Sequence, residues 1–376
     1  MPKILLVTGE ASGDIHGAHL ALALRKLNPA VELIGVGGSR MLAAGVSLLP
    51  DVDRVDAMGI PGIRQLMKGW KTLRTLSRLV QQEHFDAIIL IDSPGLNLRL
   101  AKVASKMSHN IIYYIAPQVW AWGSRRLKLI RKVIKHVLAI LPFEEKFFQK
   151  AGIACTYVGH PLLDELRPSY DKAHERQRFG LDPENMVIGL LPGSRVKEVQ
   201  DMLPTLMKTV QQIQDRYPML QVLLAQAHSL SDSVIHEFLG HSGQQVKVVK
   251  GQTNEVIAAS DILLVTSGTA TLQAALIGTP MVVLYRTSPL TYQIAKCLVK
   301  IPYISLVNLL AGKEIVPELI QNRMTPDCIA EEALEILRDT GRRDAMKHAF
   351  QSIRTSLGGP GASKRAAEII LAEAIS

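Results

Sequence analysis

The chain has few cysteines and no long apolar run. Its 376 residues include three cysteines, Cys155, Cys297 and Cys328, which lie far apart and form no CxxC pair. This usage is typical of a reducing compartment and argues against structural disulfides or structural zinc. No apolar run approaches the roughly 18 residues of a membrane-spanning helix, and the run from Ile4 to Val7 is too short for the core of a secretory signal. We therefore expect a cytoplasmic protein.

Common cofactor and metal signatures are also missing. There is no Walker A motif, and GVGGSR at residues 35–40 lacks both the third glycine of the dinucleotide fingerprint and a strand-end acid about 20 residues later. The DVD at residues 51–53 has no flanking strand pattern, so we expect a solvated loop there. We expect no cofactor and no metal site.

Positive charge is concentrated in the first half of the chain. Residues 1–165 contain 21 Lys and Arg against 13 Asp and Glu, so that they hold a net charge of +8 out of +9 for the whole chain. The positive electrostatic field of such a segment favours an anionic partner. Nucleic acid, acidic lipid and a phosphorylated substrate all qualify.

Two strongly basic segments create this field. Residues 60–80 carry five basic residues and no acidic one, and residues 124–136 carry six and none. The first has basic residues at helical spacing with apolar residues on the other side, as in a helix that lies on an anionic membrane; an ordinary surface helix is the more frequent alternative. RNA-binding aromatic signatures and a clear helix-turn-helix are absent, so we expect no nucleic acid partner. The candidates for membrane or acyl-chain contact are Ile63, Arg64, Leu66, Met67, Lys68, Trp70 and Lys71.

Short apolar runs alternate with helix-length amphipathic segments along most of the chain. This pattern predicts an α/β protein with parallel sheets covered by helices. Strands are expected at residues 3–8, 31–37, 86–92, 110–116 and 136–142, and again at 185–192, 220–226, 245–251, 261–267 and 280–286. We expect two Rossmann-like domains facing across a cleft, with ligands at the carboxyl ends of the strands. The expected boundaries are 1–165, 166–340 and a C-terminal helical segment, 341–376, that packs on a domain or on a partner subunit.

The segment LLPGSRVKEV, residues 190–199, has the pattern of a strand, a turn and a helix start. Backbone N–H groups at Gly193 and Ser194, the positive end of the helix dipole and the guanidinium of Arg195 would converge, as a diphosphate requires. An ordinary helix start with an exposed arginine is the alternative.

The segment VTSGTATLQAAL, residues 265–276, repeats this pattern. Ser267, Gly268 and Thr269 open a helix, and Gln273 lies about one turn further along, where its amide can reach sugar hydroxyls. A simple N-cap is the alternative, but two such helix starts in one unit favour nucleotide binding. Asn308 lies in an apolar run and, if buried, must bond either to a ligand or to the backbone.

In the first half, acidic residues follow two of the expected strands. Asp92 ends one strand, where a carboxylate can accept a proton from a substrate hydroxyl, and a helix N-cap is the alternative. Glu10 and Asp14 lie in GEASGD, a small-residue loop that resembles a phosphate cradle although its carboxylates would oppose a phosphate.

Eight segments, taken in order, carry a specific family resemblance. They are GEASGD, IDSPGLN, PQVWAW, LPFEEKFF, VGHPL, LLPGSR, SGTATLQ and SLVNLLAG. Together they resemble the lipid-A-disaccharide synthases, which are glycosyltransferases of family 19 with the GT-B fold. The resemblance implies an inverting enzyme that joins UDP-2,3-diacylglucosamine to 2,3-diacylglucosamine 1-phosphate, forming the β(1→6) disaccharide of lipid A and releasing UDP. It also implies a peripheral protein on the inner face of the inner membrane in Gram-negative bacteria, and possible homodimers with exchanged C-terminal segments.

The resemblance also implies roles for individual residues. Asp92 matches an essential aspartate, a candidate base for the acceptor's 6-hydroxyl. Arg195 and Asn308 match positions tied to UDP and activity, and Glu10 and Asp14 match an acidic pair on the acceptor side.

The chain departs from the family pattern at two positions. Gly95 stands where a second acid is common, and Gln273 stands where related enzymes often have Glu. A UDP-sugar 2-epimerase and a non-catalytic, membrane-bound UDP-sugar sensor remain as alternative functions.

Overall fold

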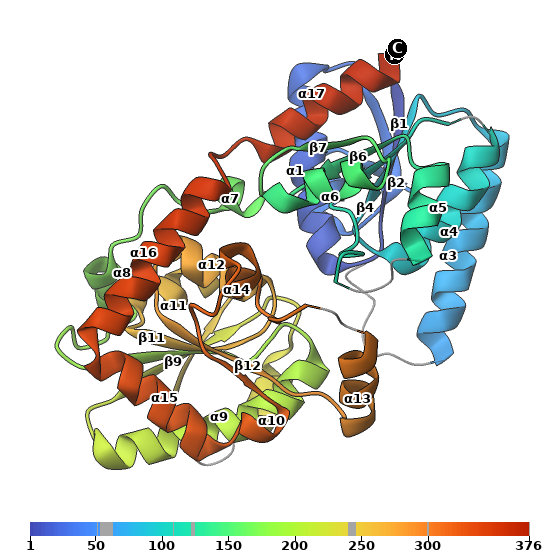
Figure 1. Ribbon diagram of the computed structural model, residues 1–376. Coiled ribbons are helices and arrows are strands. Elements are labelled where there is room, and N and C mark those ends of the chain that lie inside the picture. The colour runs from blue at the N-terminus through green and yellow to red at the C-terminus, as the bar shows by residue number, and fades with distance from the viewer. Residues whose placement is uncertain are drawn as a thin grey trace. The chain divides into compact units, whose positions relative to one another are not determined.

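The computed structural model of the chain describes residues 1–50, 52, 63–107, 109–121, 125–239, 246–298 and 301–375. These residues form two compact units (Figure 1). Unit 1 comprises Met1–Glu165 and Leu357–Ser376, and unit 2 comprises Leu166–Ser356. This division differs from the expected one at the C-terminus, where residues 341–356 belong to unit 2 and residues 357–376 return to unit 1.

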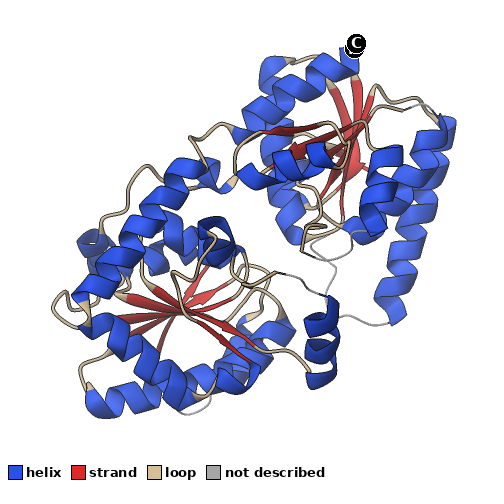
Figure 2. Ribbon diagram, in the orientation of Figure 1, coloured by secondary structure: helices blue, strands red, loops and turns tan. Residues whose placement is uncertain are grey.

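Unit 1 is a seven-stranded parallel sheet with the strand order β3-β2-β1-β4-β5-β6-β7. Figure 2 draws strands in red and helices in blue. Its strands are β1 Lys3–Thr8, β2 Glu32–Val36, β3 Ser47–Leu48, β4 Ala87–Ile91, β5 Ile111–Tyr114, β6 His136–Ala139 and β7 Cys155–Tyr157. Its helices are α1 Ala11–Leu27, α2 Ser39–Ala43, α3 Ile63–Gln82, α4 Pro94–Ala104, α5 Arg125–Val133, α6 Pro142–Lys150, α7 Leu162–Glu165 and α17 Ala362–Ile375.

Unit 2 is a six-stranded parallel sheet with the order β10-β9-β8-β11-β12-β13. Its strands are β8 Val187–Leu191, β9 Gln221–Gln226, β10 Val246–Lys250, β11 Ile262–Thr266, β12 Met281–Tyr285 and β13 Glu318–Ile320. Its helices are α8 Lys172–Arg178, α9 Val196–Arg216, α10 Asp232–Leu239, α11 Thr253–Ala259, α12 Thr269–Ile277, α13 Pro289–Leu298, α14 Leu306–Ala311, α15 Pro326–Arg338 and α16 Thr340–Ser356.

Apolar residues on both faces of each strand explain why the sheets are covered by helices. In β1, Ile4 and Leu5 are both fully buried, but they belong to two different core clusters because successive side chains point to opposite faces. All ten expected strands are present. The short strands β3, β7 and β13 were not expected, because two or three residues at the edge of a sheet leave no periodic pattern to read.

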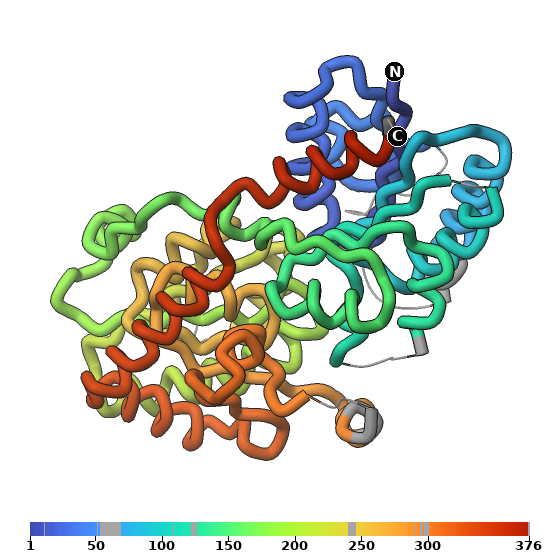
Figure 3. Tube along the Cα trace, turned by 45° about the horizontal axis from the view of Figure 1, so that its top comes forward, coloured from blue at the N-terminus to red at the C-terminus, as the bar shows by residue number. Residues whose placement is uncertain are grey.

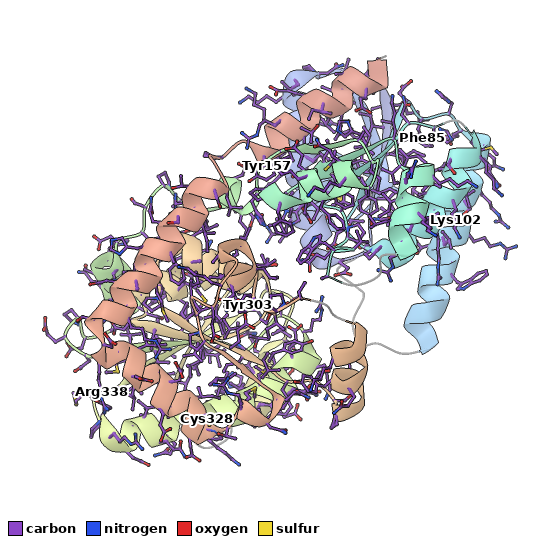
Figure 4. All side chains as sticks on the ribbon, viewed as in Figure 1. Phe85, Lys102, Tyr157, Tyr303, Cys328 and Arg338 are labelled. Atoms are coloured by element: carbon purple, nitrogen blue, oxygen red, sulfur yellow. The ribbon has the colours of Figure 1, made fainter. Side chains whose placement is uncertain are left out.

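The C-terminal segment is fastened to unit 1. Helix α17 packs against α1, and both can be followed in Figure 3. The carboxylate of Asp164 accepts hydrogen bonds from the backbone N–H groups of Gly361 and Ser363. The hydroxyl of Tyr157, labelled in Figure 4, donates to the carbonyl oxygen of Leu357 at 2.8 Å. Exchange of this segment in a homodimer stays a prediction.

The close approach of α1 to β1 generates a stability prediction. A Cβ atom at Gly13 would overlap Oγ1 of Thr8, which is itself fully buried and cannot turn aside. We expect Gly13→Ala to lower the free energy of unfolding by about 1–3 kcal/mol, measured by urea titration. Gly69 in α3 is the matched control, since a Cβ there meets no described atom within 4 Å, and Gly69→Ala should be neutral or stabilising by about 0.5–1 kcal/mol. A Gly13→Ala protein as stable as the parent would refute this account.

Candidate functional site

The candidate loops lie where the strand order of each sheet reverses. In unit 1 the chain runs outward from β1 to β3 and then returns to place β4 beside β1; in unit 2 it runs from β8 to β10 and returns to place β11 beside β8. Ligands of open parallel sheets bind outside the carboxyl ends of the strands at such reversal points. The loops after β1 and β4 contain Glu10 and Asp92, and the loops after β8 and β11 contain Arg195 and Ser267. Each unit therefore carries its candidate residues at the expected point of its own sheet.

The backbone of the loop after β1 bonds to the loop after β4. The backbone N–H of Gly9 donates to Oγ of Ser93 at 2.9 Å, so this donor is already used within unit 1. Gly13 allows α1 to pack on Thr8, as described above, and the side chain of Glu10 is exposed. Gly9 and Gly13 thus serve packing within unit 1.

The backbone holds Asp92 in a fixed and strained conformation. Asp92 and Ser93 have φ angles of 49° and 47°, in the left-handed region that such residues rarely adopt. The carbonyl oxygen of Asp92 accepts hydrogen bonds from the hydroxyl of Tyr113 at 2.6 Å and from Nδ2 of Asn97 at 2.7 Å. Burial, followed by the nearby Asp92 charge, raises the pKa of Tyr113, so this hydroxyl stays a donor. The partly buried Asp92 side chain is therefore carried on a rigid support.

Backbone strain in the described part of the chain gathers at the carboxyl ends of strands. Its four non-glycine residues with positive φ are Asp92 and Ser93 after β4, Ile115 after β5 and Gln321 after β13. Such a conformation costs about 1–3 kcal/mol per residue and persists where the surroundings impose it, often at functional sites. The strained residues after β4 and β5 therefore favour a functional site at the carboxyl ends of these two strands.

Asp14 has a structural role. Its side chain is 3 % exposed, and Oδ1 accepts hydrogen bonds from the backbone N–H groups of Gly38 at 2.7 Å and Met41 at 3.0 Å. Oδ2 accepts from the N–H of Arg40 at 3.1 Å. Asp14 therefore caps the start of α2, a structural role in place of the catalytic one expected from the sequence.

The backbone donors of the turn after β8 are bonded to a carboxylate of the protein itself, that of Glu198. Gly193 has φ of 116°, which favours glycine. The Oε2 atom of Glu198 accepts from the backbone N–H groups of Ser194 at 2.9 Å and Arg195 at 3.2 Å, and Nη1 of Arg195 donates to Oε1 at 2.9 Å. The donors expected to meet a diphosphate are thus arranged around one carboxylate. Sequence reasoning missed Glu198, although its place three residues after Arg195 has the spacing of a capping box.

The start of α12 keeps its backbone donors clear of side-chain caps. Gly268 occupies the N-cap position and has no side chain with which to cap the first turn. Ser267 directs its hydroxyl to the carbonyl oxygen of Ile304 at 2.9 Å, while Thr269 is exposed. Nε2 of Gln273 donates to Oδ1 of Asn254 at 3.3 Å. This helix start can still receive an anion.

Asn308 is fully buried, and its amide bonds to the protein on every side. Of the two possibilities that the sequence leaves open, the structure shows bonding to the protein. Within the described residues, no group of three or more His, Cys, Asp or Glu side chains is placed to hold a metal ion.

Comparisons with known proteins identify the family of the chain. Residues 4–373 match the family model described as "Lipid-A-disaccharide synthetase". The lipid-A-disaccharide synthase of Geobacter metallireducens is 38 % identical over 370 residues, covering 98 % of this chain and 96 % of that protein. The enzyme of Myxococcus xanthus is 40 % identical over 378 residues, covering 98 % and 97 %. The chain belongs to the lipid-A-disaccharide synthase family.

Solved structures with bound UDP or UDP-GlcNAc share the fold of this member of the lipid-A-disaccharide synthase family. UDP-GlcNAc 2-epimerase from Neisseria meningitidis, bound to UDP-GlcNAc, has a TM-score of 0.67 at 15 % identity and covers 98 % of this chain and 100 % of its own. Arabidopsis thaliana UGT89C1 complexed with UDP has a TM-score of 0.63 at 14 % identity and covers 100 % of both chains. At these identities the likeness shows the fold alone: two parallel-sheet, Rossmann-like domains of the GT-B type.

The basic helix α3 has two distinct faces in this family member. Thr72, Leu76 and Val80 are buried at four-residue spacing, while Lys71 is exposed and Trp70 is 68 % exposed. Beyond residue 71 the apolar side of the helix therefore packs into unit 1. The side chains of Ile63, Arg64, Leu66, Met67 and Lys68 lie outside the described residues. No described helix has the length and apolarity needed to cross a membrane.

The capping role of Asp14 predicts a loss of stability. Asp14→Ala removes the acceptor for three buried or half-buried N–H groups, and we expect the free energy of unfolding to fall by about 1–3 kcal/mol. Glu10→Ala changes an exposed side chain directly before α1, the helix that contains Asp14, and the free energy of unfolding should stay within about 0.5 kcal/mol of the parent. Urea titration of both variants checks this, and equal stability of the two would contradict the capping role.

Proposed function

We propose that unit 1 holds the acceptor and supplies the catalytic base Asp92, and that unit 2 binds the UDP group of the donor. The chain is a glycosyltransferase of lipid A disaccharide synthesis by family membership. For the substrates we propose UDP-2,3-diacylglucosamine and 2,3-diacylglucosamine 1-phosphate. The observation that carries the proposal is the placement of Asp92, Arg195 and the Ser267–Thr269 turn at the reversal points of the two sheets.

The proposed reaction is a single inverting displacement. Asp92 accepts the proton of the acceptor's 6-hydroxyl, and that oxygen forms a bond to C1 of the donor sugar as the bond from C1 to the diphosphate oxygen breaks. UDP leaves with the electron pair. A base of this kind contributes about 10²–10⁴-fold to the rate when it is held within hydrogen-bonding reach of the proton. The hydrogen bonds from Tyr113 and Asn97 support such a fixed position.

Unit 2 offers positive charge and backbone donors to the diphosphate. Arg195 is a charge-assisted donor, and the start of α12 adds N–H groups and the positive end of a helix dipole. Gly268 has an extended backbone, and a Cβ there would meet no described atom within 4 Å, so the fold itself does not require glycine at this position. Close approach of a ligand would explain the residue. Gly193, Ser194 and Gln273 complete the proposed donor site, where the bonds from Ser194 and Arg195 to Glu198 must be exchanged for bonds to the diphosphate.

Product analysis tests the function directly. The protein should convert UDP-2,3-diacylglucosamine to disaccharide and UDP only when the monosaccharide 1-phosphate is present. Conversion of the UDP-sugar without acceptor would favour an epimerase, and UDP binding without turnover would favour a sensor.

The role of Asp92 predicts a selective loss of catalysis. Asp92→Asn keeps the size of the side chain, and Asn tolerates the left-handed backbone better than Ala does. We expect kcat/KM to fall by about 10²–10⁴-fold because the base is lost, while the Kd for UDP and the melting temperature stay unchanged. Asp215→Asn, at an exposed position on α9, is the control and should keep full activity. An Asp92→Asn enzyme within threefold of the parent would remove Asp92 from the mechanism.

We further propose that the beginning of α3 binds the protein to the anionic inner face of the inner membrane. Trp70 exposes a large apolar ring beside Lys71, and Arg74 and Arg78 are exposed on later turns of the helix. Aromatic insertion and attraction between basic side chains and acidic headgroups reinforce each other at such a surface. The second basic helix, α5, exposes Lys128, Arg131 and Lys132 in the same unit.

Vesicle sedimentation tests the membrane proposal. The triple variant Lys68→Ala, Trp70→Ala, Lys71→Ala should sediment at least about fivefold less with vesicles containing anionic phospholipid, since each basic residue near the surface contributes about 1 kcal/mol. The matched control is Lys208→Ala, Met219→Ala, Lys347→Ala in unit 2, where Met219 is also 68 % exposed. Equal sedimentation of the triple variant and the parent would exclude this helix as the anchor.

A further inference from the structure

One carboxylate in unit 2 gathers four hydrogen-bond donors from a single neighbouring segment. Oε1 of Glu318 accepts from the backbone N–H of Ser305 at 3.0 Å, from Oγ of Ser305 at 2.8 Å and from Nδ2 of Asn308 at 2.9 Å. Oε2 accepts from the N–H of Ile304 at 2.9 Å. Glu318 begins the edge strand β13, so the segment from Ile304 to Asn308 is tied directly to the sheet.

Asn308 completes this arrangement and has no hydrogen-bonding capacity left. Its Nδ2 donates to Glu318 and to the carbonyl oxygen of Val316 at 2.9 Å, and its Oδ1 accepts from the N–H groups of Ile315 at 2.8 Å and Val316 at 3.0 Å. An asparagine amide has two donor hydrogens and two acceptor lone pairs, and all four are used here. Asn308 therefore cannot hydrogen-bond a substrate without breaking a bond inside unit 2, and any effect it has on activity must act through position.

The held segment adjoins the proposed nucleotide turn. Oγ of Ser267 donates to the carbonyl oxygen of Ile304 at 2.9 Å, and α14, which starts at Leu306, packs against α12. Tyr303, labelled in Figure 4, directly precedes the first residue that Glu318 holds. The positions of the turn after β11 and of the segment around Ile304 are thus linked.

We propose that Glu318 is a positioning residue for UDP binding, which it supports by fixing residues 304–308 against the Ser267–Thr269 turn. Asn308 acts with it from the opposite end of the same segment. This inference rests on the proposed function, in which that turn binds the UDP group of the donor. Neither residue needs to touch the nucleotide.

The test replaces one oxygen of the carboxylate by a group that cannot accept. Glu318→Gln has the same shape, but its NH₂ would face an N–H donor of the held segment, and the segment should loosen. We expect the Kd for UDP, measured by calorimetry, and the KM for the UDP-sugar to rise about tenfold, with kcat changed less than about threefold. Glu314→Gln is the control, because Glu314 is an exposed glutamate of the same connection and should leave both constants unchanged.

A milder variant covers the case in which Glu318→Gln does not fold. Ser305→Ala removes one of the four donors and should raise the Kd for UDP about threefold. A lower melting temperature with an unchanged Kd and KM, in whichever of the two variants folds, would overturn the inference and leave Glu318 a purely structural residue. Arg195→Ala distinguishes failure of the positioning role from failure of the proposed nucleotide site. If Arg195→Ala weakens UDP binding while Glu318→Gln and Ser305→Ala do not, only the positioning role fails. If none of the three changes the Kd, the proposed nucleotide site itself is wrong.

Discussion

The parallel register of two strand pairs is the constraint on which both candidate surfaces depend. In unit 1 the ladder pairs Thr8 with Ile91, so that the residues following these two strands leave the sheet side by side. The hydrogen bond from Gly9 to Ser93 is the direct result. In unit 2 the ladder pairs Val265 with Leu191, which brings the turn after β11 next to the turn after β8. A parallel sheet places all its carboxyl ends at one edge, and the order reversal opens space between two of the loops.

Two acids near these edges hold neighbouring segments, and a third is the candidate catalytic residue. Asp14 accepts three backbone N–H groups and Glu318 accepts four donors, so both carboxylates hold neighbouring segments of their own unit in place. Asp92 is held differently, since the bonds from Tyr113 and Asn97 go to its backbone carbonyl oxygen. Its position is fixed by the main chain while its side chain is only partly buried. That combination suits a group that must exchange a proton.

The sequence predicts the strands and the loops well because both depend on local patterns. Buried parallel strands appear as apolar runs, and a helix start appears as a cluster of small and polar residues directly after such a run. The roles of individual side chains depend on contacts between distant residues. Asp14 meets residues 38–41, and Asn308 meets a segment about eight residues further along that has no regular pattern. Glu318 gives no local signal, because it is one glutamate at the start of a three-residue strand whose partners come from residues 304–308.

The role of a glycine also depends on contacts that the local sequence does not reveal, as two loops of similar sequence show. After β1, Gly13 in the first turn of α1 lies so close to Thr8 that no Cβ fits, and Gly9 in the loop lets Ser93 approach and accept its N–H. Protein atoms explain both glycines, and they leave no backbone donor at Gly9 for a phosphate. In the loop after β11, Gly268 has open space and an extended backbone, so protein atoms do not explain it. A small-residue loop after a strand is therefore evidence for a phosphate site only where the fold itself does not require the glycine. By that criterion the two loops differ, and only the loop after β11 supports the proposed phosphate site.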